Sequence, residues 1–138
     1  MWPFAERKPL EEAELERRLL LLKAQVEAKL QRLEARLLPR RQALEKGLEE
    51  FRKTLAHLEA LAQEGRYPPP VLAPALERER LRIAQVEAEL KAISEKLSER
   101  RTRLYLEARG RGARLGAREA RLKELWPLEV DGEPVANL

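Results

Sequence analysis

Apolar residues recur at intervals of three and four along most of this chain, and this spacing limits the possible folds more than any other feature. One series runs from Leu15 to Leu58 and a second from Leu76 to Leu104. Residues three and four apart share a face of an α-helix, so each series predicts a long amphipathic helix. With 38% charged residues and no cysteine, the 138-residue chain is expected to be all-α, a long antiparallel helical hairpin or coiled coil.

Prolines and glycines suggest where the elements begin and end. We expect an N-terminal arm at 1–8, a first helix over 9–64, a proline-rich turn at 65–73 and a second helix over 74–109. Pro39 removes one backbone hydrogen bond, which predicts a kink or break at residues 35–39. After the second helix we expect a glycine- and arginine-rich hinge at 110–116, a short helix at 117–126 and an extended tail at 127–138, formed as a strand, an Asp-Gly turn and a strand.

The predicted turn also sets how the two helices pair. Paired residue numbers should sum to about 138, which places Pro39 beside Glu99 and Val26 beside Gly112. Two helices bury little apolar surface, and the run Leu19–Leu22 is apolar nearly all around the helix, so a homodimer or a docked protein is expected. The same spacing suits a hairpin within one chain and a coiled coil between chains.

Charge is unevenly distributed along the chain. Residues 15–41 and 99–123 hold 17 basic and 6 acidic residues and so carry a net charge of +11, whereas the remaining 11 basic and 18 acidic residues sum to −7. Such a zone predicts an anionic partner, either lipid headgroups or nucleic acid, unless glutamates neutralise it as an ordinary solvated surface. The candidate anion-binding residues are Lys29, Arg32, Arg36, Arg40, Arg100, Arg103, Arg111, Arg114, Arg118 and Arg121.

Catalysis has little support in the sequence. His57 is the one histidine, and Ser94 and Ser98 are the two serines, so neither a catalytic triad nor a His or Cys metal cluster can be built from one chain. The Gly110–Gly116 segment lacks the Lys-Ser/Thr pair of a phosphate-binding loop. We therefore expect a non-enzymatic protein without a cofactor.

The ends of the hairpin are the candidate sites for a protein partner. The proposed docking residues are Trp2, Phe4, Leu20, Leu21 and Trp126. The aromatic residues could insert at a membrane interface, or they could instead cap the end of the helical bundle. No apolar run is long enough to span a membrane and no signal peptide is evident, so a cytoplasmic or virion location, with peripheral membrane association allowed, is expected.

The helical series from Leu15 to Leu58 and from Val86 to Leu104, together with the two arginine stripes, resemble the minor capsid protein of sphaerolipovirus-like phages. These tailless viruses have an internal membrane and infect thermophilic bacteria. The resemblance covers whole-chain character and no single motif, so it transfers no site residue. It implies a helical dimer between lipid and capsid shell, bound to the membrane by charge and recruiting a major capsid protein.

The residues alone predict a structural or assembly protein that holds an anionic surface, with lipid headgroups as the first candidate, and bridges it to protein. One alternative is a protein that binds nucleic acid without reading sequence. A second alternative is a coiled-coil adaptor within a larger complex.

Overall fold

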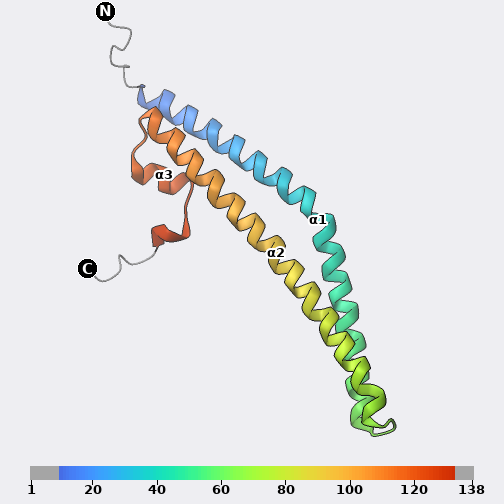
Figure 1. Ribbon diagram of the computed structural model, residues 1–138. Helices are drawn as coiled ribbons and strands as arrows, with labels where there is room; N and C mark the ends of the chain where they lie inside the picture. Colours follow the sequence, from blue (N-terminus) through green and yellow to red (C-terminus); the bar gives the residue numbers. More distant parts are fainter. Residues whose placement is uncertain (1–9, 133–138) are drawn as a thin grey trace, which may run out of the picture. The chain divides into compact units, whose positions relative to one another are not determined.

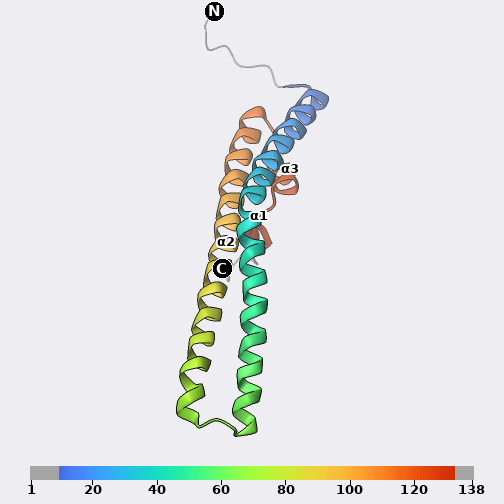
Figure 2. The ribbon, with the colours of Figure 1, turned by 90° about the vertical axis from the view of Figure 1, so that its right-hand side faces the viewer.

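The computed structural model describes residues 10–132, and most of them are helical (Figure 1). Helix α1 spans Glu12–Glu64, α2 spans Pro69–Leu115, α3 spans Glu119–Leu125, and a 3-10 helix, η1, spans Glu129–Gly132. No strand occurs among residues 10–132. The two long helices pack against each other as a hairpin (Figure 2), which confirms the predicted all-α class.

The chain divides into two compact units, and each is described by itself. Unit 1 contains the residues up to Arg32 and those from Ser98 onward, and unit 2 contains Leu33–Leu97. The core of unit 1 is formed by Leu19, Leu22, Val26, Leu30, Leu104, Ala108, Leu122, Leu125 and Trp126. In unit 2, the buried apolar residues are Leu44, Leu48 and Leu72.

The first helix begins later than expected and does not break. α1 starts at Glu12, three residues after the predicted start at Pro9, which lies outside the described residues. Glu12 and Glu14 lie in the first turn, where the helix dipole favours negative charge. α1 continues through Pro39, so the predicted break is wrong, because the hydrogen bonds of the neighbouring turns and the apolar seam outweigh the one lost bond. The kink stays a prediction.

The turn between the two long helices is shorter than the sequence predicted. Gly65, with φ 71°, follows α1, and α2 already begins at Pro69 rather than at Pro74. The first four N–H groups of a helix have no acceptor within it, so Pro69 and Pro70 lose no helical hydrogen bond there. The expectation that residues 65–73 all lie outside a helix was therefore wrong.

The early start of α2 changes the pairing of the helices. With helix ends at Glu64 and Pro69, paired residue numbers sum to about 133 at the turn rather than 138. Leu19, not Val26, lies at Gly112, where an ideal Cβ would be 3.2 Å from the Leu19 Cδ2 atom. In unit 2, Arg40 forms an ion pair with Glu89 and Arg52 forms one with Glu87, and the pairing of Pro39 with Glu99 stays a prediction.

The predicted hinge at 110–116 is helical for most of its length. α2 runs through Gly110 and Gly112 to Leu115, and it ends at Gly116, whose φ is 102°. A Cβ at Gly112 would lie 2.4 Å from the Leu122 Cδ2 atom, so this glycine makes room for α3. The glycines that lower helix propensity are thus compensated by packing, and no flexible hinge forms at 110–115.

Candidate anion-binding surface

One side of unit 1 is covered by α3 and by the residues that follow it. Leu122, Leu125 and Trp126 are buried there, and Trp126 is only 1% exposed. The short C-terminal helix was predicted at 117–126 and observed at Glu119–Leu125, nearly as expected. Trp126 was expected to dock a protein partner, but its side chain is instead buried in the core of unit 1.

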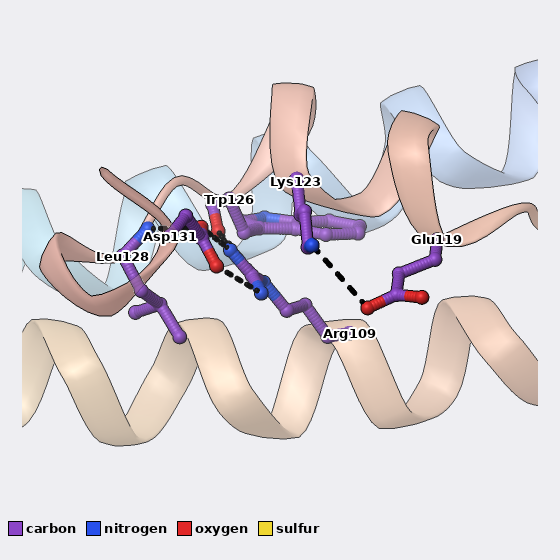
Figure 3. A network of polar contacts seen from close by, with 6 residues as sticks. All are labelled: Arg109, Glu119, Lys123, Trp126, Leu128 and Asp131. Carbon is purple, nitrogen blue, oxygen red and sulfur yellow. Dashed lines mark hydrogen bonds and ion pairs between the residues drawn. The ribbon is translucent and has the colours of Figure 1, made fainter. Parts of the chain in front are cut away.

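Arg109 holds the segment after α3 in place (Figure 3). Its Nε and Nη2 atoms donate hydrogen bonds of 2.9 and 2.7 Å to the Trp126 carbonyl oxygen, and its Nη1 donates to the Asp131 carboxylate at 3.1 Å. The Leu128 N–H donates to the same carboxylate at 2.9 Å. The Arg109 guanidinium and then the Leu128 N–H lower the pKa of Asp131 to about 2.

These bonds explain why the predicted strand, turn and strand do not form over the described part of the tail. Asp131 was expected to start a hairpin turn, but its carboxylate is bound by Arg109, and Glu129–Gly132 form a 3-10 helix. Residues 133–138 lie outside the described residues. Arg109 and Asp131 are 22 residues apart, so helical spacing could not have identified their contact.

Two predicted anion-binding residues are already paired with carboxylates. Arg121 donates hydrogen bonds to Glu16 of α1 and to Glu124, the latter at 3.0 Å, and Glu16 is the main cause that raises the pKa of Arg121. In unit 2, Arg40 is 2.7 Å from the Glu89 carboxylate. Both residues therefore have part of their charge balanced inside the protein, which sequence spacing did not reveal because another helix supplies the carboxylate.

The predicted stripe Arg111, Arg114, Arg118 and Arg121 is also interrupted. α2 ends at Leu115, and Arg118 is the residue that precedes α3, so the four residues do not lie on one helix. Arg111 and Arg114 instead continue backward along α2 to Arg103 and Arg100, at helical intervals of three and eight.

Six exposed cations of unit 1 have no carboxylate partner within residues 10–132, and we call them the cationic surface. Arg32 forms only a hydrogen bond within its own helix, from Nε to the Ala28 carbonyl at 3.3 Å. The interval between Arg103 and Arg111 holds one carboxylate on the same stripe, Glu107, so positive charge still predominates. The cationic surface consists of Lys29, Arg32, Arg100, Arg103, Arg111 and Arg114.

These six residues lie on the side of unit 1 that α3 leaves uncovered. Arg109 marks the α3 side of α2, and at ~100° per residue the four arginines of the surface lie roughly 120–180° around the helix from it. Glu16 marks the α3 side of α1 through its bond to Arg121, and Lys29 and Arg32 lie roughly 140–160° away from it. Both stripes therefore face away from α3.

The remaining predicted cations lie elsewhere. Arg36 is exposed on α1 in unit 2 and has no carboxylate partner within the described residues. Arg118 is likewise exposed and unpaired within residues 10–132, but it precedes α3 rather than belonging to the α2 stripe.

Two of the proposed docking residues are exposed on α1. Leu20 and Leu21 are 49% and 53% exposed, whereas Leu19 and Leu22 are buried in the core of unit 1. Leu21 and Arg32 are eleven residues apart, which places them within ~20° of each other around α1. Trp2 and Phe4 lie outside the described residues.

Within residues 10–132, no group of three His, Asp or Glu side chains is arranged to hold a metal ion. None of the helices in this part of the chain combines the length and the apolar character needed to span a membrane. Comparison with known proteins produced no match to a family model, a curated protein or a solved structure. The proposal for the function therefore depends on the charge, exposure and packing of the described residues.

Proposed function

We propose that this protein is a non-enzymatic assembly protein whose cationic surface binds the headgroups of an anionic lipid membrane, while other surfaces hold protein partners. The observation that carries this proposal is the separation of charge in unit 1. On the α3 side, Arg109 and Arg121 are neutralised by carboxylates, whereas the six cations on the opposite side are exposed and unpaired.

The charge of this surface is large enough to act as a membrane contact. Each Lys or Arg near an anionic membrane contributes ~1 kcal/mol, so six could together contribute several kcal/mol at low salt. Screening limits this attraction, since the Debye length is only ~10 Å at 0.1 M salt. Binding should therefore weaken steeply as salt increases.

An exposed apolar residue on the same face of α1 as one of the cations favours lipid over nucleic acid. Leu21 lies on nearly the same face of α1 as Arg32 and is half exposed, so it could enter the acyl region while the arginine contacts headgroups. Tyr105, the aromatic residue of the cationic zone, packs against the core of unit 1 and is only partly exposed. Base stacking, on which single-strand binding depends, thus has little support here.

The minor capsid resemblance fits within this proposal. A capsid protein of a virus with an internal membrane needs one basic face toward lipid and another surface toward the protein shell. Leu20, which lies on α1 away from the core, is a candidate contact for such a protein or for a second copy of this chain.

Co-sedimentation with vesicles tests the proposal. Purified protein is mixed with vesicles containing phosphatidylserine, or with neutral phosphatidylcholine vesicles, over a salt series and with duplex DNA as competitor. We expect retention on the anionic vesicles alone at moderate salt, and retention should persist in excess DNA. Replacing Arg100, Arg103, Arg111 and Arg114 by Glu should abolish it.

A matched variant controls for total charge. Replacing four exposed cations of unit 2 by Glu changes the net charge equally and should leave vesicle binding within about twofold; these are Lys46, Arg78, Arg80 and Lys91. Circular dichroism should show that both variants stay helical. An equal loss of vesicle binding in both variants, or transfer of the wild-type protein from vesicles to DNA, would overturn the lipid proposal. If the wild-type protein binds neither vesicles nor DNA, the lipid proposal is also overturned and the adaptor alternative is left.

A further inference from the structure

The surface beneath α3 is shaped for that helix. Leu19 and Ala108 are 1% exposed because Leu122, Leu125 and Trp126 of the C-terminal segment cover the core at this point. Gly112 completes the fit, since a Cβ there would be 2.4 Å from Leu122 and 3.5 Å from the Trp126 ring. We call this surface, formed by Leu19, Ala108 and Gly112, the α3 notch.

Only three residues, Gly116–Arg118, connect α2 to α3, and α3 folds back beside the end of α2 (Figure 1). Gly116 makes this reversal, because its φ of 102° is a conformation that residues with a Cβ rarely adopt. The Gly116 N–H donates to the Ala113 carbonyl and the Ala117 N–H donates to the Gly112 carbonyl, both at 3.0 Å, which closes the end of α2.

The residues on both sides of Gly116 are strong helix formers. Ala113–Leu115 and Ala117–Leu125 contain only Ala, Arg, Leu, Glu and Lys, and α2 passes through Gly110 and Gly112 without ending. Low helix propensity of glycine therefore does not explain the end of α2. The left-handed backbone conformation of Gly116 explains where α2 ends. Without that conformation, α2 could continue into α3.

We propose that α3 can be exchanged between two copies of this chain, and that Gly116 is the residue that keeps it on its own α3 notch. If α2 continued through residues 116–118, α3 would point away from its own notch with Leu122, Leu125 and Trp126 uncovered. A second copy offers an identical notch, so a two-fold dimer with exchanged α3 helices would restore the contacts between α3 and the notch, while the bonds of the turn at Gly116 would be replaced by helical ones. This inference is independent of the lipid proposal.

If the notch is vacated by its own α3, the partner that fits it is the α3 of a second copy, because the notch matches this segment specifically. The notch accommodates Leu122 and Trp126, and the Arg109 and Glu16 side chains that flank it bind the Trp126 carbonyl, Asp131 and Arg121. A second copy supplies this same set of apolar and charged partners.

Cross-linking in a Gly116→Ala variant tests the exchange. The chain has no cysteine, so Glu16→Cys and Arg121→Cys, which replace a pair in contact, give two unique sites for a short bismaleimide. With Gly116 we expect linkage within one chain. Alanine in the left-handed region is disfavoured enough to raise the ratio of inter-chain to intra-chain linkage by roughly 5- to 30-fold.

Gly110→Ala is the matched control, because Gly110 lies in regular helix and a Cβ there has nothing within 4 Å. It should not change the linkage. Gly116→Asn, whose side chain tolerates the left-handed region better, should give an intermediate ratio, and it also decides the question if the alanine variant does not fold.

Two cross-linking results would overturn the proposal. One is a folded Gly116→Ala protein that cross-links within single chains alone, and the other is an equal rise of inter-chain linkage in Gly110→Ala. Trp126 emission, measured in a Trp2→Phe background, supplies a second readout. It should stay that of a buried indole in the exchanged dimer, whereas an exposed Trp126 without inter-chain linkage would also contradict exchange.

Discussion

At the scale of single residues, a residue type that looks unfavourable in a helix can be explained by a side chain that is distant in sequence and packs against it. Gly112 lowers intrinsic helix propensity, yet its missing side chain admits Leu122. Glu79 shows the opposite situation in unit 2, where the residue is 7% exposed and its Oε1 accepts a hydrogen bond from Arg82 at 3.1 Å, while its Oε2 has no partner within the described residues. Glu79 therefore lowers the stability of unit 2, because a buried, partly unsatisfied carboxylate costs free energy.

The Arg109–Asp131 pair predicts acid sensitivity of the C-terminal segment. The pKa of Asp131 is lowered from 3.8 to about 2 in the folded protein, so its stabilising effect is present above the unfolded value and is lost as pH falls through about 2. In a Trp2→Phe background, Trp126 emission should therefore shift toward that of exposed indole between about pH 4 and pH 2.

Two substitutions separate this effect from general acid unfolding. Asp131→Asn should remove much of the shift in that pH range. Glu14→Gln should leave it in place, because Glu14 also has a pKa of about 2 but contacts Arg17 and Arg18 instead of Arg109. Identical profiles for the wild type and Asp131→Asn would show that the pair does not hold the segment.

At the scale of elements, the effect of a proline depends on its position in the helix. Pro39 lies in the interior of α1, where it removes a backbone hydrogen bond, whereas Pro69 is the first residue of α2 and removes none. Both residues are exposed, so their packing does not obscure the comparison.

We therefore expect Pro39→Ala to raise the free energy of unfolding by roughly 1–2 kcal/mol, since the regained hydrogen bond and helix propensity exceed the added entropy of the unfolded chain. Pro69→Ala should change it by less than ~1 kcal/mol, in either direction. Urea unfolding followed by circular dichroism measures both. A loss of stability in Pro39→Ala would mean that the proline ring contributes a contact that alanine cannot replace.

At the scale of the whole molecule, buried apolar residues are unequally shared between the two units. Unit 1 has nine in its core and adds α3 as a third helix, whereas unit 2 has three and consists of two helices. Residues such as Leu55 and Ile83 in unit 2 are only partly buried. Local opening should consequently require less free energy in unit 2.

Hydrogen exchange followed by mass spectrometry tests this inequality. Peptides from 19–30 and 104–112 should exchange at least ~10-fold more slowly than peptides from 55–61 and 76–83, which corresponds to ~1.4 kcal/mol in opening free energy. The comparison requires correction for the intrinsic exchange rate of each sequence. Uniform protection would instead show that both units open together as one cooperative body.

The sequence by itself determined the helical class, the two long helices, the short C-terminal helix and the positive character of the zone. These properties depend on residues three and four apart, whose relation the chain carries locally. The sequence pattern did not predict that Pro69 begins α2. This one boundary changed the sum of paired residue numbers at the turn from about 138 to about 133.

Only the tertiary structure decided which charged side chains have no partner of opposite charge and whether Trp126 is buried or exposed. Arg121 and Arg109 meet carboxylates that lie 105 and 22 residues away, Arg40 meets one that lies 49 residues away, and Trp126 is buried because Gly112 leaves space beside it. Such partners become neighbours only after the helices have paired and α3 has folded back. The physical reason is that charge neutralisation and burial depend on distances in space, which a pattern along the chain does not contain.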